Sequence, residues 1–462
     1  MTDAPATAVP FPRTFWTANT TELFERAAYY SMASFVVIYL GRLGLGDYWP
    51  SNLNGLLWFL VYFLPILSGT IADRVGFRRA LLVAFVLLAI GYFLMGYPVW
   101  FGGLTLAPVV SQEITAGVDT VVPVVMALLL IGVGGSVIKP CISGTVQKTH
   151  AGRATLAFAI FYMVINIGSL VGRVVAYFVR SAWADLSLIF AVALGASVVA
   201  FFVVLALYRD VEAAAPATPT TPTTSKTSLG AALVNMVLVL KSGRFVLFLL
   251  VSSGFWFVYN QVYNVLPLYV KRVVELSPAM DLYTAANPVT IVVFQLLITR
   301  LFGKLQAIRS IVVGTVIIGL SMVINLYPLF AAGGLRAPTI GWLPLGSLFI
   351  MLTVSLIAFG ELFTSPRTFE WVGALAPKGQ EGLFLGYVNL PMAIGSLVGG
   401  PVGAYLFNDV ICEGAVLRAD GLLELDPVMA ARGWLILMAV GFASAASMWA
   451  YTRWLQRQPA VS

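Results

Sequence analysis

The sequence predicts an all-α polytopic membrane protein with twelve transmembrane helices arranged as two halves of six. Only 10% of the 462 residues are charged and 60% are hydrophobic, whereas roughly 25% of the residues in a soluble domain are charged. Apolar runs such as ALLVAFVLLAIGYFLMG and FLLVSSGFWFVY approach the ~20 residues that cross a bilayer, and such runs recur along the chain. A segment rich in Pro, Thr and Ala divides them into two sets.

The expected spans define the domain organisation. The first six lie near residues 20–43, 51–72, 79–98, 121–147, 154–178 and 184–208. The second six lie near residues 245–270, 283–303, 309–331, 342–366, 380–407 and 432–455. We therefore expect an N-terminal bundle (1–208), a cytoplasmic linker with an interfacial helix (209–244) and a C-terminal bundle (245–462). The linker contains EAAAPATPTTPTTSKTS, a composition that cannot build a core.

The distribution of basic residues predicts the orientation. With the N-terminus in the cytoplasm, the cytoplasmic segments hold more than twice as many Lys and Arg residues as the opposite segments. We therefore interpret the net charge of +7 as topological rather than as a sign of a nucleic-acid partner. The first residues lack the pattern of a cleaved signal peptide. These features indicate a multi-pass inner-membrane protein with both termini cytoplasmic, which we expect to work as a single chain.

Cysteine and histidine are too few for a metal centre. Cys141 lies inside an expected span, Cys412 in a late loop, and His150, the single histidine, in a cytoplasmic loop. We expect no metal and no cofactor. Two six-helix halves are typical of an alternating-access carrier. A membrane enzyme or a partner-binding scaffold is the alternative, although the sequence offers it no nucleophile with an attendant base and no sizeable soluble domain.

The first span carries three ionisable residues within the stretch ELFERAAYY. Helical spacing places them on one broad face with two tyrosines: Glu22, Glu25, Arg26, Tyr29 and Tyr30. A charge near the bilayer centre costs several kcal/mol or more unless it is paired or in contact with water, so we expect this face to line a wet cavity. The alternative is that the glutamates lie at the cytoplasmic end, reach water and pair with the arginine.

Three other spans each carry a charge. Lys139 in GGSVIKPCISG and Glu361 in IAFGELFTSP lie mid-span in opposite halves, which permits an ion pair across the central cavity. Protonation of the carboxylate, or a charged substrate, would break that pair and shift the balance between open states. A purely structural pair is disfavoured, because it is usually no more stable than an apolar replacement. Arg173 in SLVGRVV fits either a helix–helix pair or a position near the outer interface.

Other polar and aromatic residues in the spans are weaker evidence. Taken singly, the tyrosines and Trp256 are better explained by packing against lipid or neighbouring helices. The asparagines within spans, taken singly, are likewise better explained by hydrogen bonds between helices: Asn166, Asn260, Asn264 and Asn287.

Five segments resemble the major facilitator superfamily and, within it, the proton-coupled oligopeptide transporter family. GTIADRVGFRR, which spans Gly69 to Arg79, resembles the superfamily motif between the second and third helices. ELFERAAYY resembles the family's first-helix motif, and FYMVINIGSLVG its fifth-helix signature. IKPCISG and GELFTSP match its fourth-helix lysine and tenth-helix glutamate segments. The segments occur in the expected order and cover both halves, so we expect the major facilitator fold.

The resemblance implies roles for individual residues. Proton coupling would fall on Glu22, Glu25, Arg26 and Glu361. Arg26 and Lys139 would meet the carboxylate of a peptide, and Glu361 its amino terminus. The remaining substrate-binding positions implied by the family are Tyr29, Tyr30, Tyr62, Asn166, Trp256, Asn260, Asn287 and Ser365. The residues of the cytoplasmic gate motif would be Gly69, Asp73, Arg74, Arg78 and Arg79.

The chain departs from the family pattern at three positions. Ala27 stands where the family usually has phenylalanine, Ala33 where it often has a basic residue, and Asn260 where it usually has an acid. In the family the last two can pair to close the outer gate. Loss of both partners can be nearly neutral, whereas loss of one would strand a charge. The gate is therefore expected to close by other contacts.

The resemblance implies a proton-coupled symporter that imports di- or tripeptides, or similar small zwitterionic solutes, by alternating access. The alternative within transport is a carrier for a non-peptide organic solute or a drug, with altered proton coupling. Many bacterial members insert two extra helices between the halves. The linker here is too short for them, so twelve spans are expected rather than fourteen.

Overall fold

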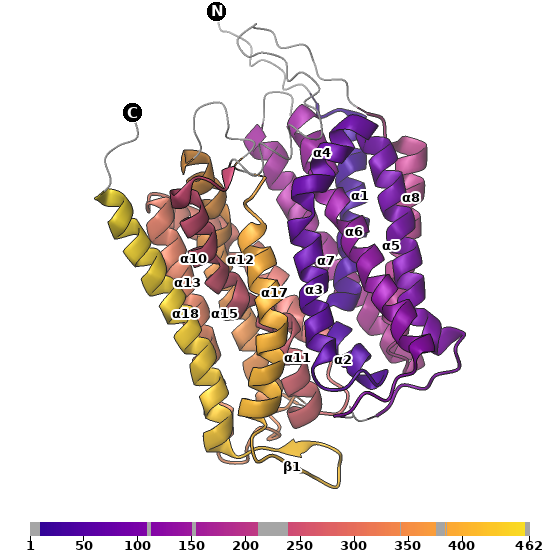
Figure 1. Ribbon diagram of the computed structural model, residues 1–462, viewed down its shortest axis with the longest axis vertical. Helices are drawn as coiled ribbons and strands as arrows, with labels where there is room; N and C mark the ends of the chain where they lie inside the picture. Colours follow the sequence, from indigo (N-terminus) through magenta and orange to yellow (C-terminus); the bar gives the residue numbers. More distant parts are fainter. Residues whose placement is uncertain are drawn as a thin grey trace, which may run out of the picture.

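Long apolar helices form two side-by-side groups in the computed structural model, which describes residues 10–108, 112–149, 154–210, 239–341, 343–375, 384 and 386–457. Figure 1 shows the first half in indigo to magenta and the second in rose through orange to yellow. The elements of the first half are α1 (Arg13–Ala33), α2 (Val36–Arg42), α3 (Trp49–Phe63), α4 (Pro65–Val75), α5 (Phe77–Trp100), α6 (Val118–Thr149), α7 (Ala154–Trp183) and α8 (Leu188–Leu207).

The second half is more interrupted. Its helices are α10 (Gly243–Asn260), the 3-10 turn η1 (Gln261–Tyr263), α11 (Val265–Tyr269), the π-helical turn η2 (Val270–Val274), α12 (Met280–Phe302), α13 (Ala307–Val323), α14 (Leu326–Phe330), α15 (Leu345–Leu375), α17 (Leu390–Tyr405), the π-helical turn η3 (Leu406–Ile411) and α18 (Pro427–Gln456). The strands β1 (Val416–Leu417) and β2 (Leu423–Glu424) pair antiparallel. This hairpin gives structure to the loop between η3 and α18.

The number of membrane-crossing segments is close to the predicted twelve. Ten helices in the described ranges are long and apolar enough to cross a membrane, and an eleventh span is the pair α3 and α4, bent by 41°. The bend follows Leu64, where Pro65 begins α4. The remaining expected span is α1 continued by α2. The ionisable residues of ELFERAAYY lie on α1. The protein is thus a multi-pass membrane protein whose spans are all helical, as the sequence predicts.

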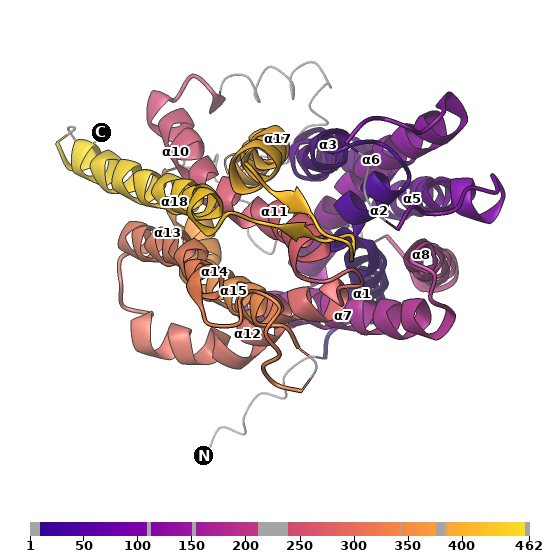
Figure 2. The same ribbon diagram turned by 90° about the horizontal axis from the view of Figure 1, so that it is seen from below.

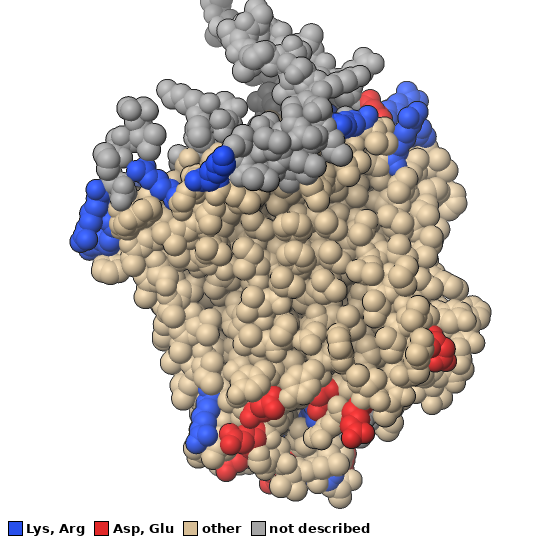
Figure 3. All heavy atoms as spheres, in the orientation of Figure 1, with Lys and Arg blue, Asp and Glu red and all other residues tan. Residues whose placement is uncertain are grey.

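The two ends of the bundle differ in charge. α1 begins and α18 ends at one end, here called the termini end, whereas α2, α11 and the β1–β2 hairpin lie at the opposite, hairpin end (Figure 1). On the face shown in Figure 3, Lys and Arg gather at the termini end, and most Asp and Glu lie toward the hairpin end. A belt with almost no charge separates them. Residues 211–238, which hold most of the predicted linker 209–244 and its interfacial helix, and His150 lie outside the described residues.

The halves meet along two helix pairs. Figure 2, seen from the hairpin end, places α17 beside α3 and α12 beside α7. Glycines permit the first contact: a Cβ on Gly55 would lie 2.7 Å from the carbonyl oxygen of Ser396, and one on Gly400 would lie 2.4 Å from that of Ser51. Small residues that let backbones approach closely are typical of helix pairs in membranes.

Glycines also set the contact between α1 and α7. A Cβ on Gly168 would lie 2.5 Å from the carbonyl oxygen of Leu23, and one on Gly172 would lie 2.2 Å from that of Ala27. The two glycines are one helical turn apart, so α7 lies directly against the charged helix α1. Ala27, where the family usually has phenylalanine, is 6% exposed at this contact, and its small side chain leaves room for α7.

The seventh span breaks at an asparagine-rich turn. The α-helix ends at Asn260, and Asn264 has φ −122° and ψ −78°, outside the helical region. Asn54 of the first half donates to the carbonyl of Tyr263, at 2.9 Å, and to Oδ1 of Asn264, at 3.0 Å. A broken helix survives at membrane depth only where neighbouring groups satisfy its freed backbone, and Asn54 does this from the opposite half.

Candidate functional site

Glu22, Glu25 and Arg26 form a buried charged cluster on α1. The guanidinium Nε of Arg26 lies 3.3 Å from Oε1 of Glu22 and donates a short hydrogen bond to Glu25. All three residues are at most 1% exposed. The arrangement in which the glutamates reach water at the helix end is therefore not the one observed. One cation between two carboxylates leaves a carboxylate in excess, which a proton can neutralise.

Tyr30 joins this cluster to a second arginine. Its ring centroid lies 5.9 Å from Cζ of Arg26 and 4.4 Å from Cζ of Arg173, within the range of cation–π attraction. Tyr29 is also within cation–π range of Arg26, whose Cζ lies 5.5 Å from its ring centroid, but Tyr29 is 1% exposed and its ring lies edge-on to Trp58 with centroids 5.8 Å apart. Of the two predicted tyrosines, only Tyr30 is partly exposed; Tyr29 belongs to the core in this conformation.

Lys139 and Glu361 do not form the ion pair that their positions permitted. The ammonium of Lys139 instead lies 5.0 Å from the ring centroid of Tyr62, and no carboxylate in the described residues is within ion-pair distance of it. Glu361 Oε2 accepts from Nδ2 of Asn287 at 3.4 Å. An aromatic ring and an amide thus replace the opposite charge, and both ionisable residues remain partly exposed.

Aromatic rings connect these groups across the boundary between the halves. The centroid of Trp58 lies 5.6 Å from that of Tyr62 and 4.6 Å from that of Tyr263 in the second half. Trp256 lies 5.2 Å from Tyr259, which is 6.4 Å from Tyr263. The predicted residues Tyr62 and Trp256 are therefore the ends of one aromatic row that runs from α3 to α10.

The predicted asparagines have different surroundings. Asn287 contacts Glu361, as described above, and Asn166 donates to the carbonyl of Tyr162 on its own helix at 2.9 Å. Asn260 is 1% exposed and donates to Oγ of Ser396 at 3.1 Å. Asn260 therefore joins α10 to α17 and is sealed from solvent in this conformation. Ser365 is partly exposed on α15, one turn beyond Glu361.

The motif between the second and third helices lies at the termini end. The backbone N–H of Arg78 donates to Asp210 at 2.9 Å, and its guanidinium donates to the carbonyl of Leu205 at 2.7 Å. A Cβ on Gly69 would lie 3.3 Å from Pro140, so α4 packs closely on α6. Arg74 and Arg79 are exposed. The side chain of Asp73 lies outside the described residues.

Arg173 is a site residue whose partners the sequence did not reveal. It is 0% exposed, and it donates to Oγ1 of Thr284 at 3.0 Å and to the hydroxyl of Tyr263 at 3.2 Å, both in the second half. One turn earlier on α12, Asp281 forms an ion pair with Arg180 at 3.1 Å. A charge inside a span was the available signal for Arg173, but hydroxyl partners are too common in the sequence to be singled out.

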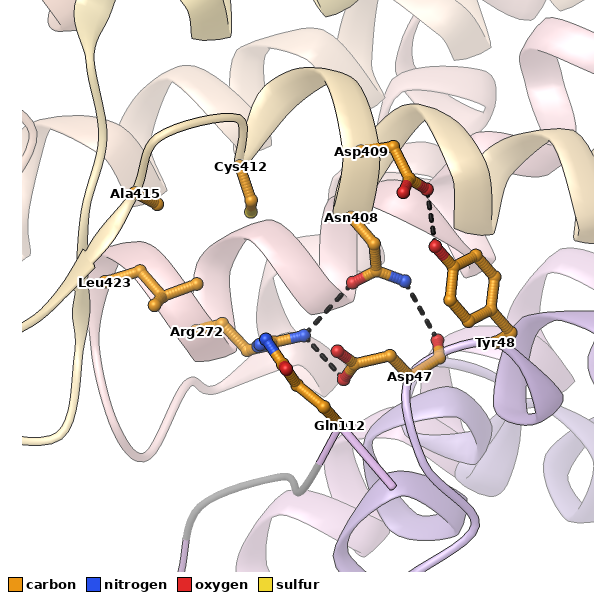
Figure 4. Close-up of a pocket in the computed structure, with 9 residues that line it drawn as sticks. All are labelled: Asp47, Tyr48, Gln112, Arg272, Asn408, Asp409, Cys412, Ala415 and Leu423. Atoms are coloured by element: carbon orange, nitrogen blue, oxygen red, sulfur yellow. Dashed lines mark hydrogen bonds and ion pairs between the residues drawn. The ribbon is translucent and has the colours of Figure 1, made fainter. Parts of the chain in front are cut away.

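A polar pocket joins the halves at the hairpin end (Figure 4). Its volume is about 270 Å³. Arg272 forms an ion pair with Asp47 at 2.7 Å and donates to Asn408 at 3.1 Å. Tyr48 donates to Asp409 at 2.5 Å. Burial raises the pKa of Asp47, although Arg272 acts against this shift.

The comparisons with known proteins agree with this architecture. The family model described as "Major Facilitator Superfamily" matches residues 55–400. The chain belongs to this superfamily. The fold is that of its solved structures: a peptide transporter crystallised in complex with alafosfalin superposes with a TM-score of 0.72 at 19% identity, covering 96% of this chain and 95% of that chain. The superfamily is one of transporters.

Relatives similar in sequence include proteins named as peptide transporters. "Dipeptide and tripeptide permease A" of Escherichia coli (strain K12) is 23% identical over 454 residues, which cover 86% of this chain and 84% of the permease. "Peptide transporter family 1" of Drosophila melanogaster is 32% identical over 173 residues, which cover 36% of this chain and 22% of that protein. These relatives confirm the resemblance to the oligopeptide transporters that the sequence motifs indicated.

Proposed function

We propose that this major facilitator is a proton-coupled symporter that imports di- and tripeptides, or small zwitterions of similar size, by alternating access. The observation that carries the proposal is the placement of Lys139 and Glu361. They lie on opposite halves, both are partly exposed, and neither is in an ion pair within the described residues. A cation and a carboxylate that each lack an opposite charge suit the two charged ends of a zwitterion.

The charged cluster on α1 would couple protons to this binding. Arg26 is shared between Glu22 and Glu25, so protonation of one glutamate leaves the arginine paired with the other. In the proposed cycle the carboxylate of the substrate competes for Arg26 and Lys139, and the displaced glutamate takes up a proton. Exchange of partners keeps each charge compensated in a medium where an isolated charge is costly.

The proposed orientation places the termini end in the cytoplasm. Basic residues at that end follow the distribution known for cytoplasmic loops (Figure 3). The protein would then be an inner-membrane carrier, working as a single chain with protons and a small solute as its partners. No chemical conversion of the solute is proposed, because transport alone accounts for the charges inside the spans.

Uptake of labelled dialanine into proteoliposomes tests the proposal. We expect accumulation with an imposed inward proton gradient and none after an ionophore collapses it. Accumulation that is equal in both conditions would contradict proton coupling, and absence of uptake by folded protein would contradict peptide transport. Recovery of a chemically altered product would instead support an enzyme.

A second solute class is favoured by the position of Asn260. This residue stands where the oligopeptide transporters usually have an acid, and its amide cannot titrate; it donates to Ser396. A carrier changed in this way would transport a non-peptide organic solute or a drug, and it would couple fewer protons to each transport cycle. Competition of dialanine uptake by a panel of peptides, modified amino acids and nucleosides separates the two classes.

A further inference from the structure

Arg173 is a buried cation whose observed partners are all uncharged. It is 0% exposed, and no carboxylate in the described residues is within ion-pair distance of it. Its guanidinium donates to the side chains of Ser169, Thr284 and Tyr263. The cost of burying the charge is thus met by hydroxyl groups and by the ring of Tyr30.

Two of these hydroxyls belong to the opposite half. Arg173 lies on α7 of the first half, whereas Thr284 lies on α12 and Tyr263 on η1 of the second. The oxygen of Thr284 is shared with Ser34 of the first half, whose Oγ lies 2.6 Å away. One threonine hydroxyl therefore contacts α7 and the turn between α1 and α2 of the first half at once.

These contacts lie on the hairpin side of the charged cluster. α1 runs from the termini end toward α2 at the hairpin end, so Tyr30 and Ser34 lie nearer the hairpin end than Glu22 (Figure 1). Thr284 lies in the first two turns of α12, which follows the loop at that end. The hydroxyls must separate from Arg173 whenever the halves part at the hairpin end.

We propose that Arg173 is the positioning residue of the gate at the hairpin end: its guanidinium latches the two halves together through the neutral hydroxyls of Thr284 and Tyr263. The latch closes the path between the substrate site and the hairpin end, and it acts beside two ion pairs that also join the halves there, Arg180–Asp281 and Arg272–Asp47. Tyr30, in contact with both arginines, connects the latch to the charged cluster. A displacement of Arg26 by substrate would therefore reach Arg173 through a single ring. The inference rests on the alternating access of the proposed function.

The test removes the two acceptors and leaves Arg173 in place. Tyr263→Phe combined with Thr284→Val deletes the hydroxyls while conserving shape, so the fold is disturbed little. The matched control is Tyr39→Phe with Thr353→Val. Tyr39 bonds Met95 within the first half, and Thr353 bonds Asn325 within the second, so the control deletes the same groups without touching the boundary.

The readout is the distance across the hairpin end, measured by pulsed electron spin resonance in reconstituted full-length protein. Spin labels are attached at Val118 and Phe330, which are 77% and 60% exposed and lie on opposite halves. Cys141 and Cys412 are replaced by alanine. The ratio of the long-distance to the short-distance population should rise on the order of tenfold in the test variant and remain at the wild-type ratio in the control.

An unchanged distance distribution in the test variant, or an equal change in the control, would overturn the latch. Arg173→Lys gives a second check, because one ammonium cannot span both hydroxyls as the planar guanidinium does, and an intermediate population is expected. The measurement requires no substrate. A failure of dialanine uptake would therefore count against the proposed solute and leave the latch to be judged by the distances alone.

Discussion

Gly55 of the first half and Gly400 of the second meet without a side chain between them. A Cβ on Gly55 would lie 3.0 Å from the Cα of Gly400, and one on Gly400 would lie 3.1 Å from the Cα of Gly55. Both distances are shorter than an ordinary carbon–carbon contact. The closed arrangement of α3 and α17 therefore depends on the absence of both side chains.

Gly400→Ala should destabilise this closed arrangement. The added methyl group would lie 2.4 Å from the carbonyl oxygen of Ser51, a backbone atom that cannot move alone, so the helices must separate. We expect a larger long-distance population between labels at Val118 and Phe330. Gly195→Ala is the control, because a Cβ there meets no atom within 4 Å. Equal distance distributions in the two variants would show that the contact tolerates a methyl group.

The charged cluster predicts a non-additive effect on stability. Glu22→Gln or Glu25→Gln leaves Arg26 with one carboxylate, so either variant should lose little stability. The double variant leaves the arginine buried without a carboxylate and should lose about 3–5 kcal/mol. Unfolding followed by circular dichroism in detergent gives the comparison. If the double variant loses no more free energy of unfolding than the two single variants lose together, Arg26 must find another partner.

Lys139→Met should weaken recognition of a substrate carboxylate. A hydrogen bond to a charged group contributes about 1.5–3 kcal/mol, so we expect KM for dialanine to rise roughly 10- to 100-fold. KM for dialanine amide, which lacks the carboxylate, should change far less. Lys148→Met on the same helix is the control. Lys148 lies in the last turn of α6, and its ammonium lies over the ring of Phe77. Equal losses for both substrates would remove Lys139 from carboxylate recognition.

Glu361→Gln should abolish uptake driven by the proton gradient. The amide keeps the contact with Asn287 but can neither carry a proton nor attract an ammonium group. The exposed hairpin residue Glu424, changed in the same way, should leave uptake unaltered. The measurement is initial uptake of labelled dialanine with an imposed gradient. Full gradient-driven uptake by Glu361→Gln would contradict both roles proposed for this carboxylate.

The sequence predicted the fold and the charged helix well, because both follow from local signals. Apolar length places the spans, and spacing of four residues places Glu22 beside Arg26. The partners of Lys139 and Arg173 were not predictable in this way. Position along a span gives depth in the membrane but not rotation toward a particular neighbour, so Lys139 meets Tyr62 instead of Glu361.

The gate illustrates the same limit. The loss of the charged pair at Ala33 and Asn260 indicated that other contacts must close the outer side. The contacts that close the outer side depend on how α7 packs against α12. The position of α7 in turn depends on the close approach of Gly172 to α1. Only the assembled helices bring Arg173 to Thr284.

The raised pKa of Asp47 predicts how pH affects closure of the hairpin end. Burial raises the pKa of this carboxyl in the closed structure, with Arg272 opposing the shift and Asp409 adding to it. When the halves part, solvent restores the ordinary value of about 3.9. The closed form therefore binds a proton at pH values where the open form does not. Proton binding favours the closed form, and this advantage is lost as pH rises through the raised pKa.

The short-distance population between the labels at Val118 and Phe330 should accordingly decrease as pH is raised from about 4 to 7. Other carboxylates titrate over the same range, so the decisive quantity is the difference between wild type and Asp47→Asn, which cannot release this proton. The slope with pH should be smaller in Asp47→Asn and unchanged in Asp420→Asn, an exposed position in the hairpin loop. If Asp47→Asn retains the full wild-type slope, the pH response arises elsewhere, and the pocket at the hairpin end serves only as a structural contact.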